Sequence, residues 1–126
     1  MAKKKPANGN KFETSVSHLK DAWRFYVDGH EPNHVRFMAL AKAFETAVEY
    51  AWKHLKRKVE DEGLEAPTPK EAIRQAAKIK LIKNASAWIE FINVRNSSTH
   101  DYFGISESYY IKNVSGFLKE LEKLMQ

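Results

Sequence analysis

Residues 37–63 read FMALAKAFETAVEYAWKHLKRKVEDEG, and this stretch decides the fold. Its apolar residues recur at steps of three and four, which is the period of an amphipathic α-helix. The residues on this stripe are Phe37, Ala41, Phe44, Val48, Ala51, Trp52, Leu55 and Val59. The opposite face carries Glu49 and Lys53, an oppositely charged pair four residues apart that favours a helix. We therefore predict one long helix over residues 34–61, with Gly63 as its C-terminal stop.

A shorter helix is predicted before the long one, over residues 11–27. Its apolar residues follow the same spacing: Phe12, Val16, Leu19, Trp23 and Tyr26. The segment DGHEPN, residues 28–33, separates the two helices because it contains Gly29 and Pro32. We expect this segment to form a loop that leads into the long helix, with Asn33 as its N-terminal cap.

Three more helices are predicted after the long one. The first opens on TPKE, residues 68–71, a capping box with proline at the first helical position, and ends near residue 80. The next runs from about residue 85 toward residue 103, and the last begins after Ser106. No strand is convincing. The expected fold is therefore all-α, an antiparallel bundle of about five helices joined by short connections.

The bulk composition is that of one soluble domain. A chain of 126 residues is long enough to bury a core, and it contains no cysteine, so thiolate metal sites and disulfides are excluded. We expect a basic disordered tail over residues 1–10 and a single helical domain over residues 11–126. The net charge is +5, but three of those charges are the tail lysines of KKK at residues 3–5, so the folded part is only mildly basic.

Two compartments are disfavoured by the sequence. The N-terminal lysines precede no apolar run of the kind that a secretory signal requires, and no stretch is long and apolar enough to span a membrane. The lack of cysteine is compatible with a reducing cytoplasm, which is the location that we expect.

The five residues HEPNH, at 30–34, match the zinc-protease pattern H-E-x-x-H. That pattern needs an unbroken helix to place both histidines on one face, and Pro32 would break such a helix. We therefore predict no metal site here. His18 and His54 lie among polar neighbours in the sequence and are interpreted as surface residues.

The segment RNSSTHDYFG, residues 95–104, carries the residues with chemical potential. Arg95 falls on the same helical stripe as Trp88, Ile92, Thr99 and Tyr102, where a core residue is expected. A buried guanidinium is costly without a partner, so Arg95 snorkels, pairs with a carboxylate, or faces a cleft or an interface.

His100 lies five residues after Arg95, about 140° around a regular helix, so the two side chains do not point at each other. Asn96, four residues before His100, is placed to hydrogen-bond with it. Either the helix end is distorted, or two copies of the helix meet across a two-fold axis and share a composite cleft. We favour the second arrangement because it explains an arginine on an apolar stripe.

An arginine and a histidine at one phosphate suit metal-independent cleavage of RNA. The histidine moves the proton of a 2′-hydroxyl or a leaving oxygen, and the arginine stabilises charge on the phosphate. The hydroxyls of Ser97, Ser98 and Thr99 could add phosphate contacts. On spacing alone, a polar helix end with a histidine stabilised by the helix dipole is the simpler explanation.

The segment Arg95 to Tyr102 fits the R-x4-H-x-Y pattern and thereby resembles the HEPN superfamily, most closely small bacterial HEPN proteins encoded beside minimal nucleotidyltransferases. The resemblance extends to FETAVEYAWKHLKRKVEDEG, PTPKEAIRQAAKIKLI and WIEFINVRNSSTHDY and covers most of the chain. It implies a helical protomer that forms a homodimer, in which two motifs meet. Association of the dimers into a higher complex is left open.

In the toxin branch of this superfamily, the resemblance implies a metal-independent endoribonuclease without a cofactor. Arg95 and His100 would then be catalytic, with Asn96 as a positioning residue. The partner nucleotidyltransferase would silence the toxin by transferring AMP to Tyr102, a role that rests entirely on the resemblance. A related branch with a similar motif implies instead a non-catalytic subunit that binds the substrate of a two-protein nucleotidyltransferase. The motif does not separate the two branches.

Overall fold

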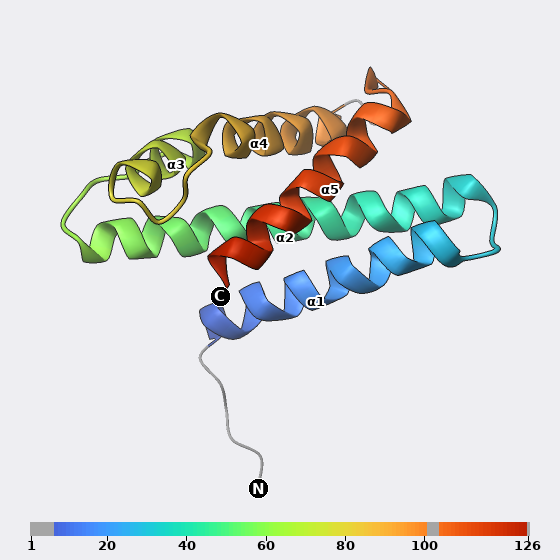
Figure 1. Ribbon diagram of the computed structural model, residues 1–126, viewed down its shortest axis with the longest axis horizontal. Helices are drawn as coiled ribbons and strands as arrows, with labels where there is room; N and C mark the ends of the chain where they lie inside the picture. The colour runs from blue at the N-terminus through green and yellow to red at the C-terminus, as the bar shows by residue number, and fades with distance from the viewer. Residues whose placement is uncertain (1–6, 101–103, 126) are drawn as a thin grey trace, which may run out of the picture. The chain divides into compact units, whose positions relative to one another are not determined.

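The structure, a computed structural model, describes residues 7–100 and 104–125. For residues 7–10, 99 and 100 it describes only the backbone. The described residues form five α-helices and no strand, as predicted (Figure 1). The helices are α1 (Ala7–Asp28), α2 (Asn33–Asp61), α3 (Pro69–Lys78), α4 (Ala85–His100) and α5 (Glu107–Leu124). The chain divides into two compact units, residues 1–54 and 55–126, and the boundary falls within α2.

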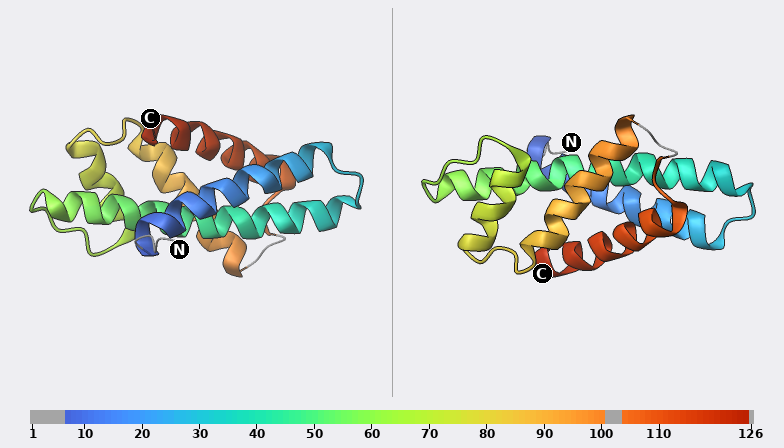
Figure 2. Two further views of the ribbon diagram at one scale, coloured as in Figure 1. Left: turned by 90° about the horizontal axis from the view of Figure 1, so that it is seen from below. Right: turned by 90° about the horizontal axis from the view of Figure 1, so that it is seen from above.

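The first unit is a helical hairpin made of α1 and the first part of α2. The two helices run antiparallel, as the views in Figure 2 show. Near one end of the hairpin the ring of Phe12 stacks on that of His54, with centroids 4.6 Å apart. Near the other end Tyr26 lies against Phe37, with centroids 6.3 Å apart. The interpretation of His54 as a plain surface residue was therefore wrong, because Phe12 covers one face of its half-buried ring.

The turn between α1 and α2 is held by one arginine side chain. Arg36 donates from Nε to the carbonyl oxygen of Glu31 (2.6 Å) and from Nη1 to that of Tyr26 (2.6 Å). Gly29 makes room for this arrangement, since a Cβ there would lie 2.4 Å from the Phe25 carbonyl oxygen and 2.9 Å from Arg36 Cδ. The helix that a zinc-protease motif requires is absent from residues 29–32, because α1 ends at Asp28 and α2 begins at Asn33.

The apolar stripe of α2 is buried as predicted. Its members with an exposed fraction of 1% or less are Ala41, Phe44, Val48, Ala51, Leu55 and Val59. Trp52 is only half-buried, and its indole Nε1 donates to the carboxylate of Glu49 at 3.3 Å. Glu49 also pairs with Lys53, at 3.0 Å, which confirms the predicted pair on the outer face.

The second unit contains the end of α2 and the helices α3, α4 and α5. In it, α4 packs against both α3 and α5. Three aromatic rings join α4 to α5 by edge-to-face contacts, with centroids 5.2–5.7 Å apart: Trp88, Phe91 and Phe117. Trp88 is 1% exposed, which confirms it as a core residue. The apolar residues of α5 at helical spacing are buried: Tyr110, Val114, Phe117 and Leu121.

The helix starts in this unit are capped by side chains. Thr68 Oγ1 accepts from the amide of Glu71, as the capping box predicts. Ser106 Oγ accepts from the amide of Tyr109 at the start of α5. Asn84 caps α4 by accepting from the amide of Ala87, a cap that the sequence analysis missed.

Helices α2 and α3 end in the same way, with different residues at the left-handed position. After α2, Gly63 has φ +85°, its amide donates to Glu60, and the amide of Leu64 donates to Val59. After α3, Lys80 has φ +67°, its amide donates to Ala77, and the amide of Leu81 donates to Ala76. Both are Schellman motifs, but only the first has the glycine that such a motif favours.

The start of α1 differs from the prediction. Helix α1 begins at Ala7, within the segment expected to be a disordered tail, and residues 1–6 lie outside the described residues. The described part of α4 reaches His100, and its predicted boundary at residue 103 lies outside the described residues. Within the described chain, no helix has the length and apolarity that crossing a membrane requires.

The two Schellman ends predict stability changes of opposite sign. Gly63→Ala should lower the free energy of unfolding by about 1 kcal/mol, because an alanine is strained at this φ although its Cβ meets no atom within 4 Å. Lys80→Gly should raise it by about 0.5 kcal/mol, because the strain relieved exceeds the added entropy of the unfolded chain. Urea unfolding followed by circular dichroism measures both changes. Equal signs for the two variants would contradict this account.

Candidate functional site

The last two turns of α4 carry Arg95, Asn96, Ser97 and Ser98, the motif residues whose side chains the structure describes. Trp88 and Ile92 on the same stripe are 1% and 3% exposed, and they pack into the second unit. Arg95 continues this stripe and is half-buried. The buried face of α4 therefore leads directly into a guanidinium, as the helical spacing predicted.

A neighbouring amide holds the Arg95 side chain. Its Nη1 donates to Oδ1 of Asn96 at 3.3 Å, and Asn96 is itself exposed. The sequence analysis placed Asn96 beside His100, whose side chain lies outside the described residues. The contact that the structure shows is between Asn96 and Arg95, so the Asn96 amide orients the guanidinium.

Ser98 is part of the packing between α4 and α5. It is 4% exposed, its Oγ donates to the carbonyl oxygen of Arg95 (3.1 Å), and it accepts from the hydroxyl of the fully buried Tyr110 (3.3 Å). A core tyrosine of α5 is thus joined through one serine hydroxyl to the backbone of the motif arginine. Ser97, by contrast, is exposed.

The structure describes little of the other motif residues, Thr99, His100 and Tyr102. The backbone of Thr99 and His100 is helical, with His100 as the last residue of α4. Their side chains, and all of Tyr102, lie outside the described residues. The structure therefore shows Arg95, Asn96, Ser97 and Ser98 together on one helix end but does not test the pairing of Arg95 with His100.

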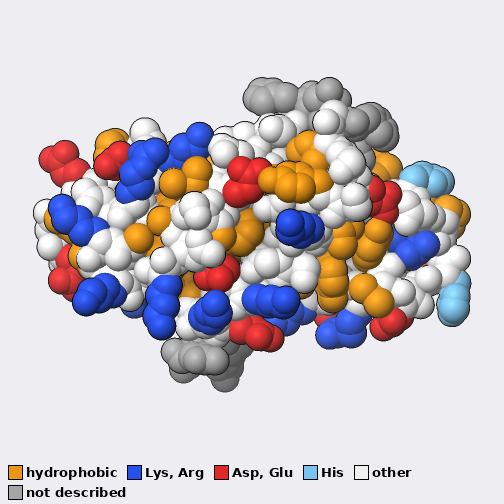
Figure 3. All heavy atoms as spheres, turned by 45° about the horizontal axis from the view of Figure 1, so that its top comes forward, with side chains coloured by type: hydrophobic (Ala, Val, Ile, Leu, Met, Phe, Trp, Pro, Cys, Tyr) orange, Lys and Arg blue, Asp and Glu red, His pale blue; other side chains and the backbone are white. Residues whose placement is uncertain are grey.

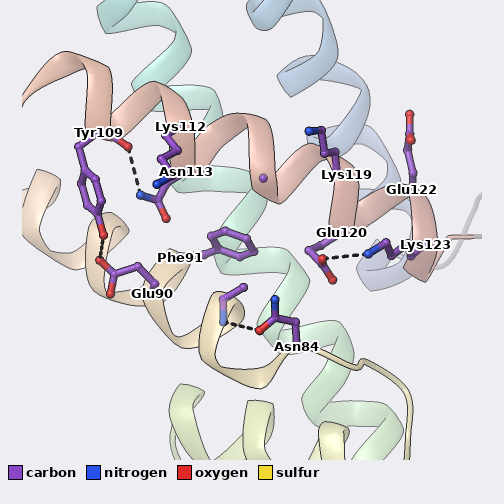
Figure 4. Close-up of a pocket in the computed structure, with 12 residues that line it drawn as sticks. Asn84, Glu90, Phe91, Tyr109, Lys112, Asn113, Lys119, Glu120, Glu122 and Lys123 are labelled. Atoms are coloured by element: carbon purple, nitrogen blue, oxygen red, sulfur yellow. Dashed lines mark hydrogen bonds and ion pairs between the residues drawn. The ribbon is translucent and has the colours of Figure 1, made fainter.

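One hollow borders this helix end, and a second lies along the earlier turns of α4. The smaller, of about 290 Å³, is called the Ser97 hollow and is lined by residues of α4 and of the start of α5, among them Glu90, Asn93, Val94, Ser97, Ile105 and Tyr109. The larger, of about 590 Å³, is called the α4–α5 groove (Figure 4). Its lining includes Asn84, Phe91, Lys112, Asn113, Gly116 and Lys119.

Glu90 and Tyr109 line both hollows and are bonded to each other. The Tyr109 hydroxyl donates a hydrogen bond to the Glu90 carboxylate (Figure 4). This carboxylate also accepts from the side-chain amide of Asn93 at 3.3 Å. Tyr109 is exposed, with 41% of its surface accessible. The hydrogen bond to Glu90 raises the pKa of Tyr109 above its ordinary value, because only the neutral hydroxyl can donate it, and the nearby carboxylate charge adds to this effect.

Tyr109 and Tyr110 are adjacent in α5 but differ in burial. The structure separates them, with Tyr110 in the core and Tyr109 at the rim of the groove. Glu90 was missed altogether. The available signal was its position on α4, five residues before Arg95 and off the buried stripe, but nothing in the sequence paired it with a residue of α5.

The charges around the site are mixed. On the face displayed in Figure 3, lysine and arginine side chains alternate with aspartate and glutamate. The α4–α5 groove itself contains lysines and glutamates in similar number. Among the described residues, no three His, Asp or Glu side chains are grouped so that they could hold a metal ion.

The part of the chain that the structure describes is all-helical, and the sequence from Arg95 to Tyr102 has the R-x4-H-x-Y pattern of HEPN-like proteins. The family model described as "Nucleotidyltransferase substrate binding protein like" matches residues 8–126. The chain therefore belongs to this family, which confirms the resemblance drawn from the sequence. No curated protein matches the chain.

The link between Tyr109 and Glu90 predicts a tyrosine titration that depends on one carboxylate. Glu90→Gln should lower the pKa of Tyr109 toward its ordinary value, because the neutral amide no longer penalises the phenolate. Since the folded-state pKa is raised, the wild type should lose this contribution to stability as the pH rises through that pKa. NMR titration of ring-labelled tyrosine measures the shift. An unchanged Tyr109 titration in Glu90→Gln would show that the carboxylate does not act on it.

Proposed function

We propose that the protein is a metal-independent endoribonuclease, the toxin of a pair formed with a minimal nucleotidyltransferase. The observation that carries the proposal is the half-buried Arg95, held by Asn96 on the core stripe of α4, five residues before a histidine at the helix end. Membership in a family named for nucleotidyltransferase substrate-binding proteins supports the partner.

In the proposed reaction His100 takes the proton of a 2′-hydroxyl, and that oxygen attacks the adjacent phosphorus. The new bond joins the 2′-oxygen to phosphorus, the bond from phosphorus to the 5′-oxygen breaks, and the leaving oxygen takes up a proton. Arg95 binds the phosphate and stabilises the charge that develops on its oxygens. The helix C-terminus favours a protonated His100, which suits it to return the proton.

The three hydroxyls predicted near the phosphate take different parts in this proposal. Ser97 is exposed in the hollow beside the motif and is the one placed for a phosphate contact. Ser98 is a positioning residue, because its hydroxyl is engaged by Tyr110 and by the Arg95 carbonyl. Thr99, on the stripe of Arg95 by spacing, remains a candidate for a phosphate contact.

We further propose that the active site is shared by two copies of the chain. Gly116, inside α5 and on the wall of the α4–α5 groove, supports a close neighbour there. A Cβ on Gly116 would lie 3.7 Å from Phe91 Cε1, an ordinary contact, so packing within the chain does not require glycine. Glycine inside a helix is destabilising, and its use here is explained if another backbone approaches α5.

Silencing is proposed to occur by AMP transfer to Tyr102. The tyrosine Oη would attack the α-phosphorus of ATP, and the bond from that phosphorus to pyrophosphate would break. The hydroxyl proton would pass to a base on the partner or to the released pyrophosphate. A nucleotide two residues from His100 would add negative charge where the RNA phosphate must bind.

A second candidate is a non-catalytic subunit that binds the substrate of a companion nucleotidyltransferase. The family is named for substrate-binding proteins of nucleotidyltransferases, which favours this candidate directly. The mixed charge of the α4–α5 groove also favours it, since nucleic-acid surfaces are commonly more basic. Cleavage of RNA decides between the two candidates.

The ribonuclease proposal predicts RNA cleavage in the presence of EDTA. Arg95→Ala and His100→Ala should each reduce the cleavage rate by about 100-fold or more, because each removes a group that acts on the phosphate or its protons. His18→Ala, the same change at an exposed histidine of α1, should leave the rate unchanged. Intact mass should first show that the sample carries no AMP.

Two outcomes separate the candidates and the arrangement of the site. No cleavage of several RNAs by unmodified wild type would favour the substrate-binding subunit. Partial recovery on mixing Arg95→Ala with His100→Ala protein would support a site shared across a dimer, since one of the two composite sites is then intact. No recovery from a mixture that exchanges subunits would count against sharing.

The silencing proposal predicts a covalent modification that needs one hydroxyl. Incubation with the partner nucleotidyltransferase and ATP should add the mass of AMP to the wild type and abolish RNA cleavage. Tyr102→Phe should remain unmodified and active under the same conditions, whereas Tyr109→Phe should still be modified. Modification of Tyr102→Phe would place the acceptor elsewhere.

A further inference from the structure

A third hollow, of about 300 Å³, lies beside the end of α3 and is called the Lys80 hollow. Its lining comes from two elements, the connection between α3 and α4 and the last turns of α5. The residues concerned are Lys80, Leu81, Ile82, Lys83, Glu120 and Lys123. Three lysines therefore border one small space, and Glu120 is the acid that lines it.

The charges of this hollow do not cancel. Lys123 pairs with Glu120 at 3.3 Å, and the Glu120 side chain is only 13% exposed. No described residue forms an ion pair with Lys80 or Lys83, both of which are exposed. Lys83 also lies two residues before α4 begins, at the positive end of that helix dipole. The hollow thus offers net positive charge to an anion.

The backbone of Lys80 is strained at a position where a glycine would not be. Lys80 has φ +67° at the left-handed position of a Schellman motif, where the equivalent residue after α2 is Gly63. A lysine is strained in this conformation and a glycine is not. A change of Lys80 to glycine therefore removes the ammonium and relieves the strain at once.

The Lys80 hollow continues into the α4–α5 groove, because Glu120 and Lys123 line both. The groove carries two more lysines of α5, Lys112 and Lys119, and reaches the Ser97 hollow through Glu90 and Tyr109. Figure 4 shows Lys112, Lys119 and Lys123 along α5. From Tyr109 to Lys123 the helix rises about 21 Å, which separates the lysine hollow from the motif.

We propose that Lys80, Lys83 and Lys123 bind phosphate groups of the RNA strand at a distance from the position of cleavage. The proposal rests on the ribonuclease function and specifies how the substrate is held. An RNA strand long enough to span the distance between them can contact Arg95 and these lysines at once. Lysine acts on phosphate as a mobile point charge, so such contacts are independent of base sequence.

The test is the affinity of the full-length protein for a short, fluorescein-labelled 2′-O-methyl RNA, which lacks the nucleophilic hydroxyl and cannot be cut. Fluorescence anisotropy should show binding about threefold to tenfold weaker for Lys80→Gly, Lys83→Gln and Lys123→Gln. Each variant should also flatten the dependence of log affinity on log salt by about 0.7. Lys58→Gln, the same loss of charge on the outer face of α2, should change neither quantity.

Lys80→Gly separates binding from folding, because it should melt at a higher temperature than the wild type while it binds RNA more weakly. Unchanged affinity and salt dependence in all three variants would overturn the proposal, as would an equal loss in Lys58→Gln. ATP is tested as a second phosphate source. Lysine-dependent binding of ATP without lysine-dependent binding of RNA would also overturn the assignment to an RNA strand.

Failure of the lysine phosphate site can be told apart from failure of the ribonuclease proposal. If the wild type cleaves RNA and the lysine variants bind the 2′-O-methyl strand normally, only the phosphate site is wrong. If the strand binds through the lysines and unmodified wild type cuts no RNA, the phosphate site stands and the ribonuclease proposal is wrong.

Discussion

The packing of α4 against α5 is the constraint on which the second unit and its site depend. The rings of Trp88, Phe91 and Phe117 meet edge to face between these helices and fix their relative rotation. Once that rotation is set, helical geometry leaves no choice about where Arg95 lies, since it follows Trp88 and Ile92 on the same stripe. The polar helix end is thus positioned by the apolar packing one and two turns before it.

Much of this architecture is local enough to be predicted from the sequence. The stripe of α2, the capping box at Thr68 and the stop at Gly63 each depend on residues within a few positions of one another. The stacking of His54 on Phe12 was not predictable, because it joins residues 42 positions apart that no local sequence pattern links. The left-handed Lys80 was missed because a lysine gives no signal for that conformation.

In the candidate site too, features that depend on one helix could be predicted from the sequence, and features that depend on two helices could not. The positions of Arg95, Asn96 and Ser97 follow from the period of one helix, and the structure places them as that period requires. The engagement of Ser98 by Tyr110 and of Glu90 by Tyr109 depends on the register between α4 and α5. That register is set by side-chain packing and is not encoded in the spacing of either helix alone. The three hollows, which are defined by pairs of elements, escaped the sequence analysis for the same reason.

The hydroxyl of Ser98 belongs to the core and to the motif at once, because it accepts from Tyr110 and donates to the carbonyl of Arg95. Selection on the motif would therefore extend to a fully buried position of another helix. If the proposed activity were lost in a lineage, position 110 would no longer need the tyrosine hydroxyl, since phenylalanine fills the same space. Substitution of both Tyr110 and Ser98 would then mark related sequences in which the proposed activity has been lost, even where the surface residues are unchanged.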